Sequence, residues 1–94
     1  MNKQVYAFGI VGANEYMLGK ISGWGDIICY GESFQEKRFA RSVTELERDG
    51  KTQEMDLMYV ETTEDKFETL CKHIRDAYSD VKGFELIIIG NVTE

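Results

Sequence analysis

The side chains best suited to catalysis are few, and their spacing does not favour it. Cys71 and His73 would together offer a thiol nucleophile and a general base. Residues two positions apart on a helix do not face each other, so these two cannot form a local dyad. We expect His73 to be solvated and Cys71 to be part of the core. No catalytic residue is predicted from this pair.

The same residue types could bind a metal ion, but the chain does not space them for it. Zinc sites gather cysteines and histidines at short, regular intervals, whereas this chain has one histidine and two cysteines, Cys29 and Cys71. The two cysteines lie far apart and form no CxxC pair, which fits two reduced thiols better than a disulfide. We therefore expect no metal, no cofactor and a cytoplasmic location.

Two glycine clusters are the places where a phosphate loop could lie. They are residues 9–12 (GIVG) and residues 23–25 (GWG). Neither cluster completes the GxGxxG fingerprint or the GxxxxGK[ST] loop of nucleotide-binding proteins. We interpret both as tight turns. A small-molecule or nucleotide-binding domain, oligomeric and with its pocket near these turns, remains the alternative function.

Trp24 is the only tryptophan and lies between two glycines, in a segment that we expect to be a loop. Large, rigid aromatic side chains often anchor binding partners. The other interpretation is that the ring folds back and closes the open end of a small core. We favour core packing, because core volume is scarce in a domain of this size.

Charge is distributed unevenly along the chain. Residues 45–68 hold nine acidic and three basic side chains, which accounts for the whole net charge of −6. Such a balance argues against direct binding of a nucleic acid, which needs clustered Lys and Arg. A negative patch would instead attract a basic protein, including the nucleic-acid-binding face of another protein. The candidate partner-binding residues are Trp24, Glu45, Glu47, Asp49, Glu54, Asp56, Glu61, Glu64 and Asp65.

The strand-like run around residues 54–57 indicates how some of the carboxylates are arranged. Glu54 and Asp56 alternate with apolar residues, so they should project together from one face of a strand. With Glu61 they are expected to face solvent. A catalytic carboxylate pair needs burial and proximity, so we do not expect an enzyme. A merely solubilising surface is the opposing interpretation of the whole segment.

Length and composition indicate one domain over residues 1–94. Of its 94 residues 43% are hydrophobic and 30% are charged, as in ordinary globular proteins. No apolar run approaches the roughly 20 residues that cross a bilayer, and the N-terminus has no signal-peptide pattern, so no membrane association is expected. A chain this short buries a small share of its surface, and formation of a homo-oligomer would add burial.

The N-terminal third reads as a β-meander. Residues 5–11 are rich in β-branched and aromatic side chains and are followed by a turn at residues 12–14. Residues 15–21 and 26–30 are two further short strand-like runs, separated by the glycines around Trp24.

The middle third has two interpretations. Residues 33–36 have the S-x-x-E form of a capping box, and apolar residues then recur at helical spacing, which predicts a helix over residues 33–48 ending at Asp49-Gly50. The competing interpretation ends that helix near Arg41, makes residues 43–46 a strand and pairs Glu47 with Lys51 across a three-residue loop. Under both, Gly50 lies at a chain reversal with positive φ, and residues 55–60 form a strand.

The clearest helix is predicted over residues 63–82, capped by Thr62 or Thr63 and stopped by Gly83. Its apolar face consists of Phe67, Leu70, Cys71, Ile74, Ala77, Tyr78 and Val81. Residues 84–89 are apolar on both faces, as in an inner strand or a strand at an interface. The expected fold is α+β: a two-layer sandwich with a mainly antiparallel sheet of four to five strands and two helices packed on it.

In size, acidity and absence of proline, the chain resembles the small accessory proteins with which bacteriophages bind and inhibit host factors. This likeness is one of composition and involves no particular residues. The function expected from the sequence is therefore that of a small acidic protein that binds and modulates another protein, in the manner of a nucleic-acid-mimicking inhibitor.

Overall fold

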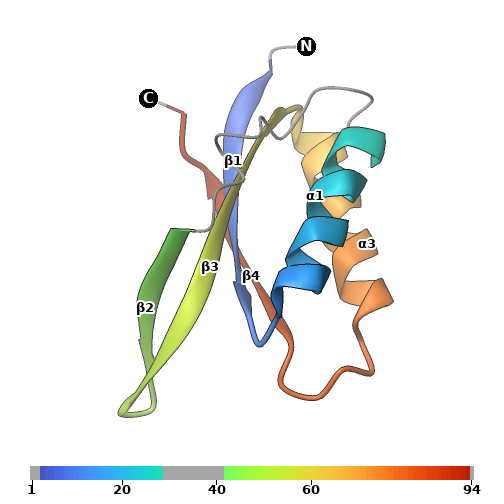
Figure 1. Ribbon diagram of the computed structural model, residues 1–94. Coiled ribbons are helices and arrows are strands. Elements are labelled where there is room, and N and C mark those ends of the chain that lie inside the picture. Colours follow the sequence, from blue (N-terminus) through green and yellow to red (C-terminus); the bar gives the residue numbers. More distant parts are fainter. Residues whose placement is uncertain (1–2, 29–41, 94) are drawn as a thin grey trace.

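A four-stranded antiparallel sheet with two helices on one of its faces forms the architecture in the computed structural model, which describes residues 3–28 and 42–93 (Figure 1). The strands lie in the order β2-β3-β1-β4. This confirms the predicted two-layer α+β fold, and the elements within the described residues follow one another as in a split β-α-β-β-α-β arrangement. The elements are β1 (Gln4–Val11), α1 (Glu15–Ile28), β2 (Ser42–Arg48), β3 (Lys51–Thr62), α3 (Glu64–Ala77) and β4 (Glu85–Asn91).

The hydrophobic core lies between the helices and the inner strands β1 and β3. Alternate residues of β1 point towards the helices, and Tyr6 stacks on Phe67 of α3 with 4.7 Å between ring centroids. The predicted strands at residues 5–11 and 55–60 are confirmed within β1 and β3. The buried cluster consists of Tyr6, Phe8, Ile10, Leu18, Ile21, Met58, Val60, Phe67, Leu70, Cys71, Ile74 and Leu86.

Residues 15–28 form the helix α1, so the predicted meander is wrong for these residues. Asn14 supplies the start of the helix, because its side-chain oxygen accepts a hydrogen bond from the backbone N–H of Met17 at 2.9 Å. Leu18 and Ile21 then recur at helical spacing on the buried face. Residues 29 and 30 of the predicted second run lie outside the described residues.

Residues 42–48 form the strand β2, so the favoured helix over residues 33–48 is wrong for this part, and residues 33–41 lie outside the described residues. The competing hairpin is confirmed in outline, with a shorter loop than predicted. Arg48 pairs with Lys51, and Glu47 pairs with Thr52. The two turn residues, Asp49 and Gly50, have φ of 53° and 73°, the conformation of a two-residue type I′ hairpin turn. The predicted positive φ at Gly50 is confirmed.

The helix α3 packs on the sheet as predicted but is shorter. Phe67, Leu70, Cys71 and Ile74 are its buried residues. The helix ends at Ala77, which is exposed, as is Val81. Thr63 occupies the N-cap position without a side-chain capping hydrogen bond. Gly83 has a positive φ of 86°, but it lies in the turn after the helix and does not terminate it.

β4 is an edge strand, so its interpretation as an inner strand covered on both sides is wrong. Among the described strands it pairs only with β1, and a register shift, as at a β-bulge, lies between Ala7 and Phe8 of that pairing. Ile88 and Ile89 are each 46% exposed. The strand buried on both sides is β1, where Phe8 and Ala7 are 0% and 1% exposed.

Candidate functional site

The turn end of the β2–β3 hairpin projects beyond the rest of the sheet. β1 pairs with β3 only from Asp56 to Thr62, so residues 51–55 form strand pairs with β2 and with no other described strand. We call residues 44–55 the acidic arm. It extends away from both helices (Figure 1) and contributes to the longest dimension of the molecule, 40 Å. An element in this position is available to a partner without disturbing the core.

The pairing register separates the charges of the acidic arm onto two faces. Glu45 lies directly opposite Glu54, and Glu47 lies opposite Thr52. Successive side chains of a strand point to opposite faces. The three glutamates therefore lie on the same face of the sheet as its core residues. All three are exposed. The two basic residues of the arm, Arg48 and Lys51, form a cross-strand pair that belongs to the other face.

Arg48 is engaged in a bidentate contact with Glu85 at the start of β4. Its Nη1 donates to one carboxylate oxygen at 2.7 Å and its Nη2 to the other at 2.5 Å. Nη2 also donates to Gln53 at 3.0 Å. The hydrogen bond from Arg48 lowers the pKa of Glu85, and the same bond raises the pKa of Arg48. This cation therefore neutralises Glu85 and not the glutamates of the arm.

The structure divides the predicted acidic segment into separate groups. Glu45, Glu47, Glu54 and the turn residue Asp49 lie together on the acidic arm. Glu61 is half-buried and lies seven residues along β3 from Glu54, about 23 Å at the usual rise per residue. The alternation of side chains also puts it on the opposite face of the sheet.

Three more predicted residues have surroundings that differ from those of the arm. Asp56 shares the face of Glu54 but is only 7% exposed, so the expectation that it faces solvent is wrong. Its position opposite Ile10 places it at the border of the core. Glu64 and Asp65 are exposed in the first turn of α3, where negative charge stabilises the helix through its dipole. They therefore have a local structural role at the far end of β3.

Trp24 lies in the helix α1 and not in a loop. Its ring is half-buried against the core. It meets the ring of His73 edge-on with 4.7 Å between centroids, and that of Tyr78 at 5.5 Å. These contacts support the core-packing interpretation of Trp24. His73 is exposed and Cys71 is buried, as expected, but His73 also contacts Trp24.

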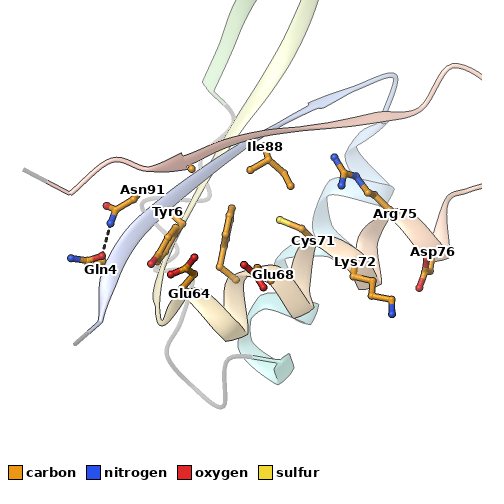
Figure 2. A pocket seen from close by; sticks show the side chains of 12 residues that line it. Gln4, Tyr6, Glu64, Glu68, Cys71, Lys72, Arg75, Asp76, Ile88 and Asn91 are labelled. Atoms are coloured by element: carbon orange, nitrogen blue, oxygen red, sulfur yellow. Dashed lines mark hydrogen bonds between the residues drawn. The ribbon is translucent and has the colours of Figure 1, made fainter. Parts of the chain in front are cut away.

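A groove that sequence reasoning missed lies between α3 and the sheet edge formed by β4 (Figure 2). Its volume is about 570 Å³. Its floor is lined by apolar side chains, which include Tyr6, Phe67, Cys71 and Ile88. Its rim is lined by charged residues of α3, which include Glu68 and Arg75. The signal in the sequence was a second face of α3, at which Glu64, Glu68, Lys72 and Arg75 recur every three or four residues. The groove is not beside the glycine clusters, where the alternative function placed its pocket.

Comparison of the sequence with models of protein families and with curated proteins gives no match. No helix within residues 3–28 and 42–93 is long and apolar enough to cross a membrane. In the same parts of the chain, no group of three or more His, Cys, Asp or Glu residues could hold a metal ion. Arguments about function therefore rest on the acidic arm and on the groove.

Proposed function

We propose that this chain is a non-enzymatic interaction protein whose acidic arm binds a basic surface of another protein. The observation that carries the proposal is the segregation of charge on the arm. Glu45, Glu47 and Glu54 share one exposed face, while the arm's two basic residues belong to the other. A surface of one sign attracts a partner of the opposite sign and accelerates their association.

The pairing of Glu45 with Glu54 supports this proposal energetically. Like charges directly opposite each other on neighbouring strands destabilise a sheet, by an amount on the order of 0.2–1 kcal/mol. A partner that brings Lys or Arg side chains to this face would remove the repulsion on binding. The repulsion between the two glutamates thus destabilises the unbound protein, and binding of such a partner removes this destabilisation.

The chemistry of the arm indicates the class of partner. Carboxylates in a row along a two-stranded ribbon complement clustered Lys and Arg, which also form the surfaces that contact nucleic-acid phosphates. A protein bound at such a surface would block it. We therefore propose that the chain modulates its partner by occupying a basic, nucleic-acid-binding face, as a small inhibitory accessory protein would.

The experiment compares wild-type protein with two variants that lose the same amount of charge. The arm variant carries Glu45→Gln, Glu47→Gln and Glu54→Gln. The control variant carries Glu61→Gln at the far end of β3, and Glu64→Gln and Asp65→Asn in the first turn of α3. Each protein is immobilised and used to capture partners from a cell lysate at low salt. The captured partners are then eluted with increasing salt. Captured partners are identified and their binding is measured with purified components.

The expected result is a partner that binds the wild type and the control variant and has lower affinity for the arm variant. This partner should dissociate as salt rises, because salt at 0.1 M largely screens exposed charges that are more than about 10 Å apart. Thermal unfolding checks the fold of the arm variant, whose midpoint should not fall because the like-charge pair has been removed. Partners that bind all three proteins equally at low salt would contradict the proposal.

A further inference from the structure

The two edges of the sheet differ in how they are protected against pairing with another chain. β2 carries Glu45, Glu47 and Arg48 along its length, and charged residues on an edge strand discourage the addition of a further strand. β4 has no charged residue from Leu86 to Asn91. Its Glu85, at the start, is engaged by Arg48. An uncharged edge strand with exposed isoleucines is a template for another strand.

The groove beside β4 continues this unprotected edge onto the helical layer. Ile88 is 46% exposed and lines the groove together with buried aromatic side chains of the core. Figure 2 shows Ile88 on the sheet side of the groove, with Cys71, Lys72 and Arg75 on the facing helix. An occupant that pairs with β4 would therefore also cover an apolar floor.

The charges along the groove are ordered from one end to the other. Glu64 and Glu68 line its rim in the N-terminal half of α3, and Lys72 and Arg75 line it in the C-terminal half, with Asp76 beside them. A two-fold axis beside β4 would place a second α3 antiparallel to the first. The acidic end of each helix would then face the basic end of the other, so this surface is complementary to itself.

We propose that β4 and the adjoining groove form a docking surface for a second copy of this chain. The two β4 strands pair antiparallel about an axis beside Ile87 and join the two sheets into one. The Ile88 side chains of both copies fill the grooves, and Glu68 of each copy faces the basic half of the other helix. The glutamates of the acidic arm lie towards the opposite edge of the sheet, and the arm meets β4 through the contact of Arg48 with Glu85 at the start of the strand.

Two features of β4 decide which contacts supply the affinity. The register between β1 and β4 is irregular, and Gly90 has a positive φ of 105°. These two features limit the regular part of the edge to the residues of β4 that precede Gly90. Pairing is therefore short, and the apolar contact at Ile88 must supply much of the binding. Arg75 donates one hydrogen bond to the carbonyl of Leu86 at 3.3 Å, and a guanidinium has further donors for a carboxylate of the second copy.

Sedimentation velocity over a range from low micromolar to high concentration tests the proposal directly. The wild type is expected to convert from monomer to dimer as concentration rises. Ile88→Lys should weaken dimerisation at least about tenfold, because it places a charge in the apolar groove. Val43→Lys is the matched control: Val43 is also β-branched, is 47% exposed and lies on the other edge strand. It should dimerise as the wild type does.

A charge exchange tests the two-fold arrangement without altering an apolar residue. Glu68→Arg and Arg75→Glu should each weaken the dimer, because each creates like-charge contacts twice in a symmetric interface. The double variant should recover dimerisation, since the exchanged charges again face each other. Circular dichroism confirms that each variant is folded.

Three results would overturn the proposal. They are a wild type that remains monomeric at every concentration, an Ile88→Lys variant that dimerises as tightly as the wild type, and a double variant that dimerises no better than the single ones. A monomeric wild type would leave the groove to a small molecule or to an extended peptide.

Discussion

Arg48 and Glu85 form a bidentate ion pair although their strands, β2 and β4, lie at opposite edges of the sheet. The hairpin end and the start of β4 come together because a strongly twisted two-stranded ribbon turns relative to the strands beside it. Both side chains are 43% exposed, so solvent and salt weaken the pair. This pair matters for geometry, since it connects the turn end of the acidic arm to the start of β4.

The lowered pKa of Glu85 makes this contact dependent on pH. A carboxylate whose pKa is lower in the folded state stabilises the fold above its ordinary pKa, about 4.3 for Glu, and this contribution is lost as pH falls through the folded-state pKa. Glu85→Gln should therefore lower the urea midpoint slightly at neutral pH. The difference from wild type should vanish in strong acid.

An Arg48→Ala background is the control for this prediction. Without the guanidinium that lowers the pKa of Glu85, Glu85→Gln should no longer produce the pH-dependent loss, and the double-mutant cycle isolates the pair. The same pH-dependent loss in both backgrounds would show that Glu85 acts through another group.

Two of the turns between the described elements, β2–β3 and β1–α1, each have a glycine at positive φ. Gly50, with φ of 73°, completes the β2–β3 turn, and a side-chain Cβ there would meet nothing within 4 Å. Gly12, with φ of 80°, follows β1, and a Cβ there would lie 2.2 Å from the carbonyl oxygen of Gly83. The first turn is restricted by backbone conformation alone. The second is also restricted by contact with the loop that precedes β4.

Gly50→Ala and Gly12→Ala should therefore differ in their cost. Gly50→Ala should lower the free energy of unfolding by about 1 kcal/mol, because alanine is strained at positive φ. Gly12→Ala adds a clash with rigid backbone, whose cost is typically 1–3 kcal/mol more, so it should destabilise the domain further. Chemical denaturation of both variants measures the order. Equal destabilisation would mean that the close approach of the two loops is not maintained in solution.

At the scale of the whole molecule, the hydrophobic core cluster lies in the interface between the helices and the sheet. Leu70 is 0% exposed in α3 and belongs to the cluster that also contains Phe8 of β1 and Val60 of β3. Both described helices lie on this face of the sheet (Figure 1). Loss of the α3 contact should therefore affect the entire domain and not one part of it.

Leu70→Asp should abolish cooperative unfolding, because it leaves a charge in this interface. Leu70→Ala should retain the fold and lower its stability by about 2–5 kcal/mol through the cavity it creates. The exposed neighbour Thr69 provides the control, since Thr69→Ala should change stability by less than about 0.5 kcal/mol. An unchanged transition for Leu70→Asp, followed by circular dichroism, would contradict the helix-on-sheet packing.

The residue types in the sequence predicted part of the acidic arm and little of the groove. The excess of carboxylates in residues 45–68 is visible in the sequence. Which of them share a face is not, because this depends on the register that sets Glu45 opposite Glu54 and buries Asp56 beside Ile10. The groove left a weaker signal, since its charged rim lies along one helix while its floor combines residues from β1, α3 and β4.

The amino-acid sequence by itself determined the elements whose signals are local and strong. The apolar period of α3, the β-branched run of β1 and the Asp49-Gly50 turn all follow from side-chain spacing and backbone preference. Tertiary structure decided the segments at residues 15–28 and 42–48, where local preferences are weak. Residues 15–28 contain three glycines, yet burial of Leu18 and Ile21 against the sheet stabilises a helix. Residues 42–48 have a helix-like apolar spacing, yet they form a strand because the turn places them beside the unpaired edge of β3, whose backbone groups they satisfy.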